Sequence, residues 1–167
     1  MNQSHDAIES LQLAALLHDV GKISIPSIIL QRPGPLVAQE ARLLQTHPRI
    51  GDDLLREVSY LGDVCEIVRA HHERFDGATT GSFPAYPGEA KGDDIPLGAR
   101  ILKVADAYDA MTNDRPYRLA GPKEDAIREL RDGAGTAFDP DVVRAFIEVL
   151  PALPRRGSSV EARLPGR

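Results

Sequence analysis

Residues 16–22 read Leu-Leu-His-Asp-Val-Gly-Lys, and they place an imidazole, a carboxylate and an ammonium group where an apolar helix ends. Ser4 is expected to cap that helix and Gly21 to end it, because serine favours the position before a helix and glycine the position after it. Apolar residues cover nearly every face of positions 8–17, so the helix is expected to be buried. Polar groups at the end of a buried helix face an enclosed space, which indicates a functional site.

Three later segments offer further metal-binding groups. His47 lies ahead of a proline, an apolar helical stripe ends in His71-His72, and Asp106 lies within another apolar helix. Imidazole with carboxylate suits Fe, Mn, Zn or Ni better than Ca. Because these donors are far apart in the sequence, only a packed fold can bring them together, and a site for more than one metal ion is predicted. Metal binding needs neutral imidazoles, so occupancy is expected to fall below about pH 6.5.

Each of these groups also has an ordinary structural explanation. His18-Asp19 alone could be a surface pair, and His47 could be a loop histidine. Asp106 could pair with Lys103 or Arg100 of its own helix. The two adjacent histidines are hardest to explain by packing alone, because buried ring nitrogens need hydrogen-bond partners.

The periodicity of apolar residues predicts an all-α fold, a helical bundle with the metal site between helices. Helices are expected over residues 4–19, 37–46, 49–57, 60–74, 96–112, 122–132 and 139–150. Residues 23–35 and 75–95 contain several Pro and Gly residues and are expected to be loops. The helix from residue 37 is expected to stop before His47-Pro48, because a residue ahead of proline avoids the helical region.

Length and composition favour one domain in a reducing compartment. The chain has 167 residues, of which 42% are apolar, and a net charge of −5 that argues against a nucleic-acid polymer as partner. Cys65 is the only cysteine, so no internal disulfide can form. No apolar run reaches membrane-spanning length and no signal peptide is evident, so a cytoplasmic location is expected. The domain is expected to cover residues 1–150, followed by a disordered tail over 151–167.

Three basic residues are candidate contacts for a phosphate. Arginine suits bidentate phosphate binding, whereas lysine acts as a point charge. Lys22 follows the His-Asp pair, and Arg115 and Arg118 are three apart around a rigid proline. The ordinary alternative for any one of them is a solvated surface charge.

Taken together, these segments resemble the HD-GYP family, a branch of the HD metal-dependent phosphohydrolases. The matching stretches occur in the family's order over about residues 11–150, at 16–22, 47–51, 71–77, 95–101, 104–111, 115–118 and 138–140. So many ordered matches are far more specific than any single short motif.

The resemblance implies an all-helical domain that holds two or three divalent metal ions, Fe or Mn first, with Zn, Ni or Mg as alternatives. It implies hydrolysis of the cyclic dinucleotide c-di-GMP to pGpG or GMP in bacterial second-messenger signalling. A diguanylate-cyclase (GGDEF) partner and an oligomer are implied as well. The implied metal ligands are His18, Asp19, His47, His71, His72 and Asp106, with Asp19 bridging two metals. Asp19 and Lys22 would be the catalytic residues, and the implied substrate contacts are Lys22, Asp109, Arg115 and Arg118.

Two departures from the family pattern are expected to matter. The family places a further ligand on a helix before the His-Asp pair, and the sequence given starts after that helix, with His5 too close to replace the ligand. The Asp-Gly-x-Gly-Tyr-Pro loop is also altered, because residues 78–85 separate Asp76-Gly77 from Tyr86-Pro87. A non-catalytic module that binds c-di-GMP or a partner, and an HD phosphohydrolase acting on another nucleotide, therefore remain alternatives.

Overall fold

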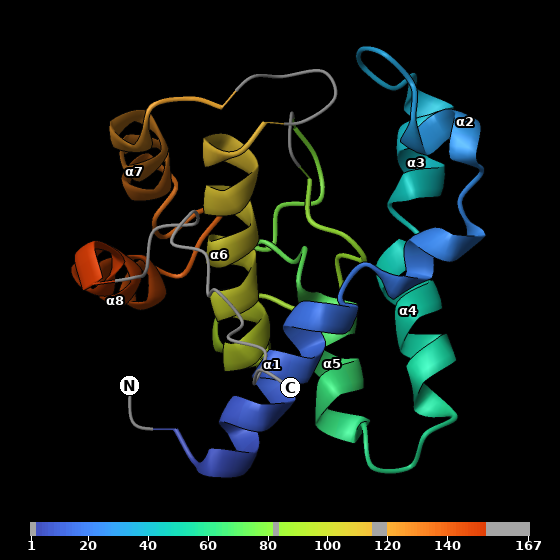
Figure 1. Cartoon of the computed structure of the whole chain (residues 1–167), viewed down its shortest axis with the longest axis horizontal. Coiled ribbons are helices and arrows are strands. Elements are labelled where there is room, and N and C mark those ends of the chain that lie inside the picture. The colour runs from blue at the N-terminus through green and yellow to red at the C-terminus, as the bar shows by residue number, and fades with distance from the viewer. Residues whose placement is uncertain (1–2, 82–83, 115–119, 153–167) are drawn as a thin grey trace, which may run out of the picture.

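The computed structural model describes residues 3–81, 84–114 and 120–152, and within these ranges it is helical, with a single isolated β-bridge between Ala134 and Phe138. The predicted all-α fold is confirmed (Figure 1). The α-helices are α1 His5–Leu17, α2 Ser27–Leu30, α3 Ala38–Leu44, α4 His47–Arg56, α5 Gly62–Ala70, α6 Leu97–Thr112, α7 Lys123–Asp132 and α8 Pro140–Val149. The 3₁₀ turns are η1 Val20–Ser24, η2 Gly92–Asp94 and η3 Leu150–Ala152.

The interior is divided into two apolar clusters that share α6. The first lies where α1, α4 and α5 meet the start of α6, with Val64 and Val68 of α5 at its centre. The second lies between α6, α7 and α8 and includes Val104 and Leu130. In Figure 1, α6 stands between these two groups of helices, while α2 and α3 lie to one side. The long helix therefore connects the two halves of the domain.

Helix ends agree with the expected capping residues in most places. The Ser4 hydroxyl accepts a hydrogen bond from the Ala7 N–H at 3.2 Å, and the Asp139 carboxylate caps α8. The helix expected from residue 37 does stop before His47-Pro48, because α3 ends at Leu44. The next helix, expected from residue 49, begins at His47 instead. Proline is tolerated in a first turn, where its missing N–H would have no helical partner.

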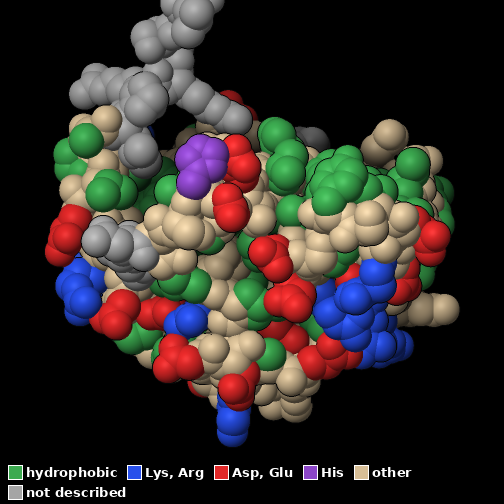
Figure 2. Space-filling model, turned by 90° about the horizontal axis from the view of Figure 1, so that it is seen from below, with side chains coloured by type: hydrophobic (Ala, Val, Ile, Leu, Met, Phe, Trp, Pro, Cys, Tyr) green, Lys and Arg blue, Asp and Glu red, His purple; other side chains and the backbone are tan. Residues whose placement is uncertain are grey.

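The predicted burial of the first helix was also wrong. Ala14 is the one buried residue among those of α1, and Leu16 is 82% exposed. Helices α5 and α6 cover one side of α1, where Leu11 and Leu17 are partly buried against the core. Ile8, Leu13 and Leu16 are exposed. Figure 2 shows one face of the molecule, with hydrophobic side chains gathered along an edge and acidic ones scattered elsewhere.

The sequence predicted a disordered tail over residues 151–167 and no membrane-spanning segment. The expected tail lies outside the described residues from position 153 onward. In the part of the chain that the structure describes, no helix is long and apolar enough to cross a membrane.

Candidate metal centre

Histidines from three separate parts of the chain converge beside one carboxylate. The Nε2 atom of His47 lies 3.4 Å from Asp19 Oδ1 and 3.4 Å from the Nε2 atom of His71. His18 Nε2 lies 3.5 Å from Asp19 Oδ2. Ligand atoms of His47, His71 and His72 all lie within 4.8 Å of one another. The turn after α1, the start of α4 and the end of α5 thus meet at a single cluster.

The backbone fixes which nitrogen of three rings faces the cluster. Each Nδ1 lies against the carbonyl oxygen three residues earlier, at 2.8 Å for His18, 2.8 Å for His47 and 2.6 Å for His71. A carbonyl only accepts, so Nδ1 must carry the proton and Nε2 the lone pair. The lone pairs of His47 and His71 then face each other, an arrangement that needs a cation between or beside them. This is the donor arrangement of a metal-binding histidine cluster, so the residues fit divalent metal ions.

Lys22 keeps the carboxylate of the cluster ionised. Its Nζ donates to Asp19 Oδ2 at 2.6 Å. Burial acts to raise the pKa of Asp19, but the hydrogen bond and charge of Lys22, helped by His18 and His47, lower it below its ordinary value. Asp19 is therefore a carboxylate with both oxygens turned toward cationic or metal-binding groups.

The buried histidines are held neutral. Burial lowers the pKa of His47, lowers that of His71 to about 3, and lowers that of His72 well below its ordinary value. Hydrogen bonding to backbone carbonyls partly offsets this for His47 and His71. Neutral imidazole is the form that binds metal, so protons compete for these sites only at a lower pH than the sequence alone suggested.

We expect the metal-free protein to lose stability as the pH falls below about 6.5, the value for a histidine in the unfolded chain. Below that pH the unfolded histidines take up protons, while the folded ones, with lowered pKa values, do not. The stability they contribute is complete above the unfolded pKa and is lost as the pH falls toward the folded one. His71, with a folded pKa of about 3, contributes a slope of about 1.4 kcal/mol per pH unit.

Urea unfolding of chelator-treated protein across this pH range measures that slope. His71→Gln should reduce the slope by about 1.4 kcal/mol per pH unit, which corresponds to one proton. His5→Gln, at an exposed position, should leave the slope unchanged. Equal slopes for the three proteins would contradict the assignment of His71 as a buried neutral histidine.

Tyr86 returns to the cluster despite the stretch that precedes it. Its ring stacks on His72 with centroids 4.4 Å apart and an interplanar angle of 29°. Burial raises the pKa of its hydroxyl, as do the charges of Asp106 and Asp19. Ala78 and Ala85, at the two ends of the intervening stretch, are hydrogen-bonded, because the Ala85 N–H donates to the Ala78 carbonyl at 2.7 Å. The stretch between Gly77 and Tyr86 therefore does not keep Tyr86 from contacting the cluster.

Glu73 holds the segment after Tyr86, a role that the sequence did not suggest. Its carboxylate is 2% exposed and accepts hydrogen bonds from the backbone N–H groups of Gly88, Glu89 and Ala90 at 3.1, 2.7 and 3.4 Å. The only signal for it in the sequence is a carboxylate directly after two site histidines. One buried acid therefore ties the tyrosine-bearing segment to the end of the histidine helix.

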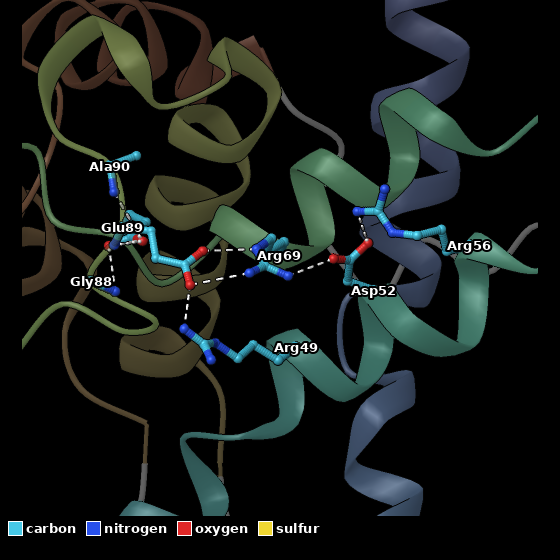
Figure 3. Close-up of polar contacts among 8 residues, drawn as sticks. Arg49, Asp52, Arg56, Arg69, Gly88, Glu89 and Ala90 are labelled. Atoms are coloured by element: carbon cyan, nitrogen blue, oxygen red, sulfur yellow. Dashed lines mark hydrogen bonds and ion pairs between the residues drawn. The ribbon is translucent and has the colours of Figure 1, made fainter.

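A line of alternating charges ties the same segment to α4 and α5 (Figure 3). Glu89 accepts from Arg49 and, at 2.8 and 3.1 Å, from Arg69. Arg69 also donates at 2.8 Å to Asp52, a fully buried carboxylate that accepts from Arg56 at 2.6 Å. Sequence reasoning missed this network, because its partners are distant along the chain and no short motif marks them. It braces the two helices that carry His47 and His71.

Gly21 serves a different purpose from the one expected. Helix α1 ends at Leu17 and Gly21 lies within η1, so the prediction that Gly21 ends the helix was wrong. A Cβ atom at this position would lie 2.0 Å from the His47 carbonyl oxygen and 2.6 Å from the Gly51 nitrogen. Only glycine lets the backbone of η1 lie directly against the backbone of α4, and that contact sets Asp19 beside His47.

A cavity of about 650 Å³ opens beside the histidines. His72, Tyr86 and Asp106 contribute to its lining, which places Asp106 next to the cluster. Of the alternative partners considered for Asp106, Arg100 pairs with Asp93 and Asp139 instead.

Of the remaining predicted substrate contacts, Asp109 is within the described residues. Asp109 is exposed on α6 and accepts a hydrogen bond from the Asn113 side chain at 2.8 Å. Arg115 and Arg118 fall outside the described residues. His5 pairs with Glu9 near the opposite end of α1 from His18, about 20 Å away along the helix, so it does not join the cluster.

Comparison with known proteins gives consistent matches. The model of the family described as "HD domain" matches residues 1–142. A cyclic di-GMP phosphodiesterase of Thermotoga maritima is 39% identical over 153 residues, covering 89% of this chain and 39% of that protein. A cyclic di-GMP phosphodiesterase of Vibrio cholerae is 40% identical, covering 85% of this chain and 29% of that protein.

Relatives named for another substrate match equally well. The 3′3′-cGAMP-specific phosphodiesterase 3 of Vibrio cholerae is 38% identical, covering 86% of this chain and 30% of that protein. The crystal structure of a cyclic GMP-AMP specific phosphodiesterase of the same species superposes with a TM-score of 0.64 at 22% identity, covering 92% of this chain and 40% of that one, which shows a shared fold. The chain spans less than half the length of each of these relatives.

Proposed function

The chain belongs to the HD domain family, as its HD-GYP-like motifs suggested, and we propose that it is a metal-dependent phosphodiesterase that hydrolyses c-di-GMP to pGpG or GMP. One observation carries the proposal. Three histidines use Nδ1 to bind their own backbone and turn Nε2 toward one another around the ionised carboxylate of Asp19. The names of relatives at 38–42% identity support the substrate class.

The proposed ligands for two or three divalent ions, Fe or Mn, are His18, Asp19, His47, His71, His72 and Asp106. When bound, such ions lower the pKa of water and offset the charge of a phosphodiester. Asp19 is proposed as the central carboxylate, since it lies against two of the histidines. Lys22 orients Asp19 and brings an ammonium group to the place where charge develops on phosphate oxygens.

Metal removal is the direct test of this function. Protein loaded with Mn or Fe is expected to convert c-di-GMP to pGpG or GMP, chelation is expected to abolish turnover, and metal return to restore it. Product chromatography measures turnover, and elemental analysis of the same samples measures metal content. If the loaded protein binds c-di-GMP and leaves it intact, the phosphodiesterase proposal fails and a non-catalytic signalling module is supported.

A second candidate is hydrolysis of another cyclic dinucleotide. The 38% identity to proteins named 3′3′-cGAMP-specific phosphodiesterases favours 3′3′-cGAMP as the alternative substrate. Running both dinucleotides side by side with the same metal-loaded sample separates the two, because the ratio of kcat/KM values names the preferred substrate.

Association with another protein is also proposed, either with a diguanylate-cyclase (GGDEF) domain or with a second copy of the chain. The supporting observation is exposed apolar surface near the site, including Leu16 at 82% and Ile23 and Ile28 at 80% exposure. The proposed cytoplasmic location follows from the signalling role.

A further inference from the structure

We infer that Lys103 is a positioning residue of the metal centre, because it joins the backbone of His72 to the helix that carries Asp106. This inference rests on the proposed function, in which both of those residues bind metal, and it adds the residue that holds them in register. Lys103 Nζ donates to the His72 carbonyl oxygen at 3.1 Å. In the sequence, Lys103 stood out only as an alternative partner for Asp106.

The ring of His72 is held differently from those of the other histidines in the cluster. His18, His47 and His71 each place Nδ1 against a carbonyl of their own backbone. Among the described residues, the His72 ring has no such hydrogen bond, and it lies instead against other rings, with centroids 4.4 Å from Tyr86 and 4.0 Å from His71. Contacts between rings are less directional than hydrogen bonds, so the place of His72 depends more on its backbone.

The backbone at His72 lies just beyond the end of a helix. Helix α5 ends at Ala70, and the last carbonyl groups of a helix have no helical partner. The Ala70 oxygen accepts from the Glu73 N–H at 2.9 Å within the same turn, whereas the His72 oxygen accepts from Lys103 of another helix. Without the ammonium group, this carbonyl would lose that partner and the turn could shift away from α6.

Lys103 also lies one helical turn before Asp106, on the same face of α6. Residues three apart on a helix point to one side and are about 4.5 Å apart along its axis. Both side chains line the cavity beside His72, and α5 packs against α6. The hydrogen bond therefore fixes the end of α5 relative to the turn of α6 that carries Asp106, and with it the spacing of two proposed ligands.

The surroundings keep a positive charge at this partly buried position. Burial, helped by the charge of Arg74, lowers the pKa of Lys103 to about 8. Three carboxylates act in the opposite direction, and they belong to Glu73, Asp106 and Asp76. The ammonium is therefore the main form at neutral pH. An ammonium repels a metal ion, so removing it would tighten metal binding if its charge were all that mattered. A positioning role predicts the opposite sign.

The test measures the affinity of the full chain for Mn, with no substrate present, by counting free Mn in electron paramagnetic resonance titrations. Lys103→Met keeps a side chain of similar length but removes the donor. It is expected to weaken Mn binding by about tenfold or more, as loss of a group that orients a metal ligand does. Lys103→Arg keeps a donor and should bind Mn more tightly than Lys103→Met. Lys123→Met, at an exposed position that begins α7, should keep the original affinity.

Urea unfolding of the chelator-treated proteins separates positioning from a purely structural role. Lys103→Met is expected to unfold at a urea concentration close to that of the original chain, because an apolar side chain suits a partly buried position. Weaker Mn binding without loss of stability is therefore the expected result.

Four results would each overturn the inference. They are Mn binding that is unchanged or tighter in Lys103→Met, a Lys103→Arg protein as weak as Lys103→Met, weaker binding accompanied by lower stability of the metal-free protein, and an original chain that binds no Mn. The last would contradict the proposed ligands as well. Failure to hydrolyse c-di-GMP bears on the proposed function alone, because these measurements involve no hydrolysis.

Discussion

Replacing Asp19 by asparagine is expected to reduce hydrolysis of c-di-GMP by on the order of a thousandfold and to lower the metal content. The side chain keeps its shape but loses its charge. It also gains an amide N–H group, and a donor there cannot serve as a ligand to a metal ion. Because Asp19 lies within 3.5 Å of both His18 and His47, the change affects the whole cluster.

Turnover and elemental analysis of the purified variant measure the two effects separately. Asp6→Asn is the matched control, since Asp6 belongs to an exposed group with His5 and Glu9 that also offers closely spaced ligand atoms. The control should keep both activity and metal. Full metal content together with full turnover in Asp19→Asn would exclude this carboxylate from the centre.

Gly21→Ala is expected to destabilise the fold by about 3 kcal/mol or more and to disturb metal binding. The added methyl group would overlap the His47 carbonyl oxygen at 2.0 Å, and both partners are backbone, so no rotamer change relieves the clash. The turn η1 must move away from α4, and Asp19 moves away from His47 with it. A change of one methyl group thus separates two proposed ligands.

Urea unfolding at constant pH measures the loss of stability. Gly62→Ala is the matched control, because a Cβ there meets nothing within 4 Å and the residue begins α5. It should lie within about 1 kcal/mol of the original chain or be slightly more stable. A Gly21→Ala protein as stable as this control would refute the close backbone contact as the reason for glycine.

Much of the helical architecture could be predicted from local sequence. Ser4 and Asp139 were identified as helix caps, and the structure shows hydrogen bonds from backbone N–H groups to both side chains. Such signals are readable because a cap acts on backbone within three residues of itself. The same local reasoning was wrong for α1, whose burial depends on which helices pack beside it.

The candidate site was also predictable from the sequence only in part. Residue types with one strong chemical use, such as His71 and His72, could be picked out from the sequence. The roles of Glu73 and Glu89 could not, because a carboxylate has many uses and their partners lie 15 to 40 residues away. Which histidine nitrogen faces the cluster was also unreadable, since the backbone conformation at each ring decides it.

By itself the sequence indicated the helical class, through the periodicity of its apolar residues, and the HD family, through motifs that resemble the family's in the same order. The list of proposed ligands came from that resemblance and from the chemistry of the individual side chains. Only the tertiary structure decided that the lone pairs of His47 and His71 meet, that Gly21 must be glycine, and that a cavity lies between α6 and α7. These features depend on distances between segments that are remote in the chain. Such distances are set by how the helices pack against one another.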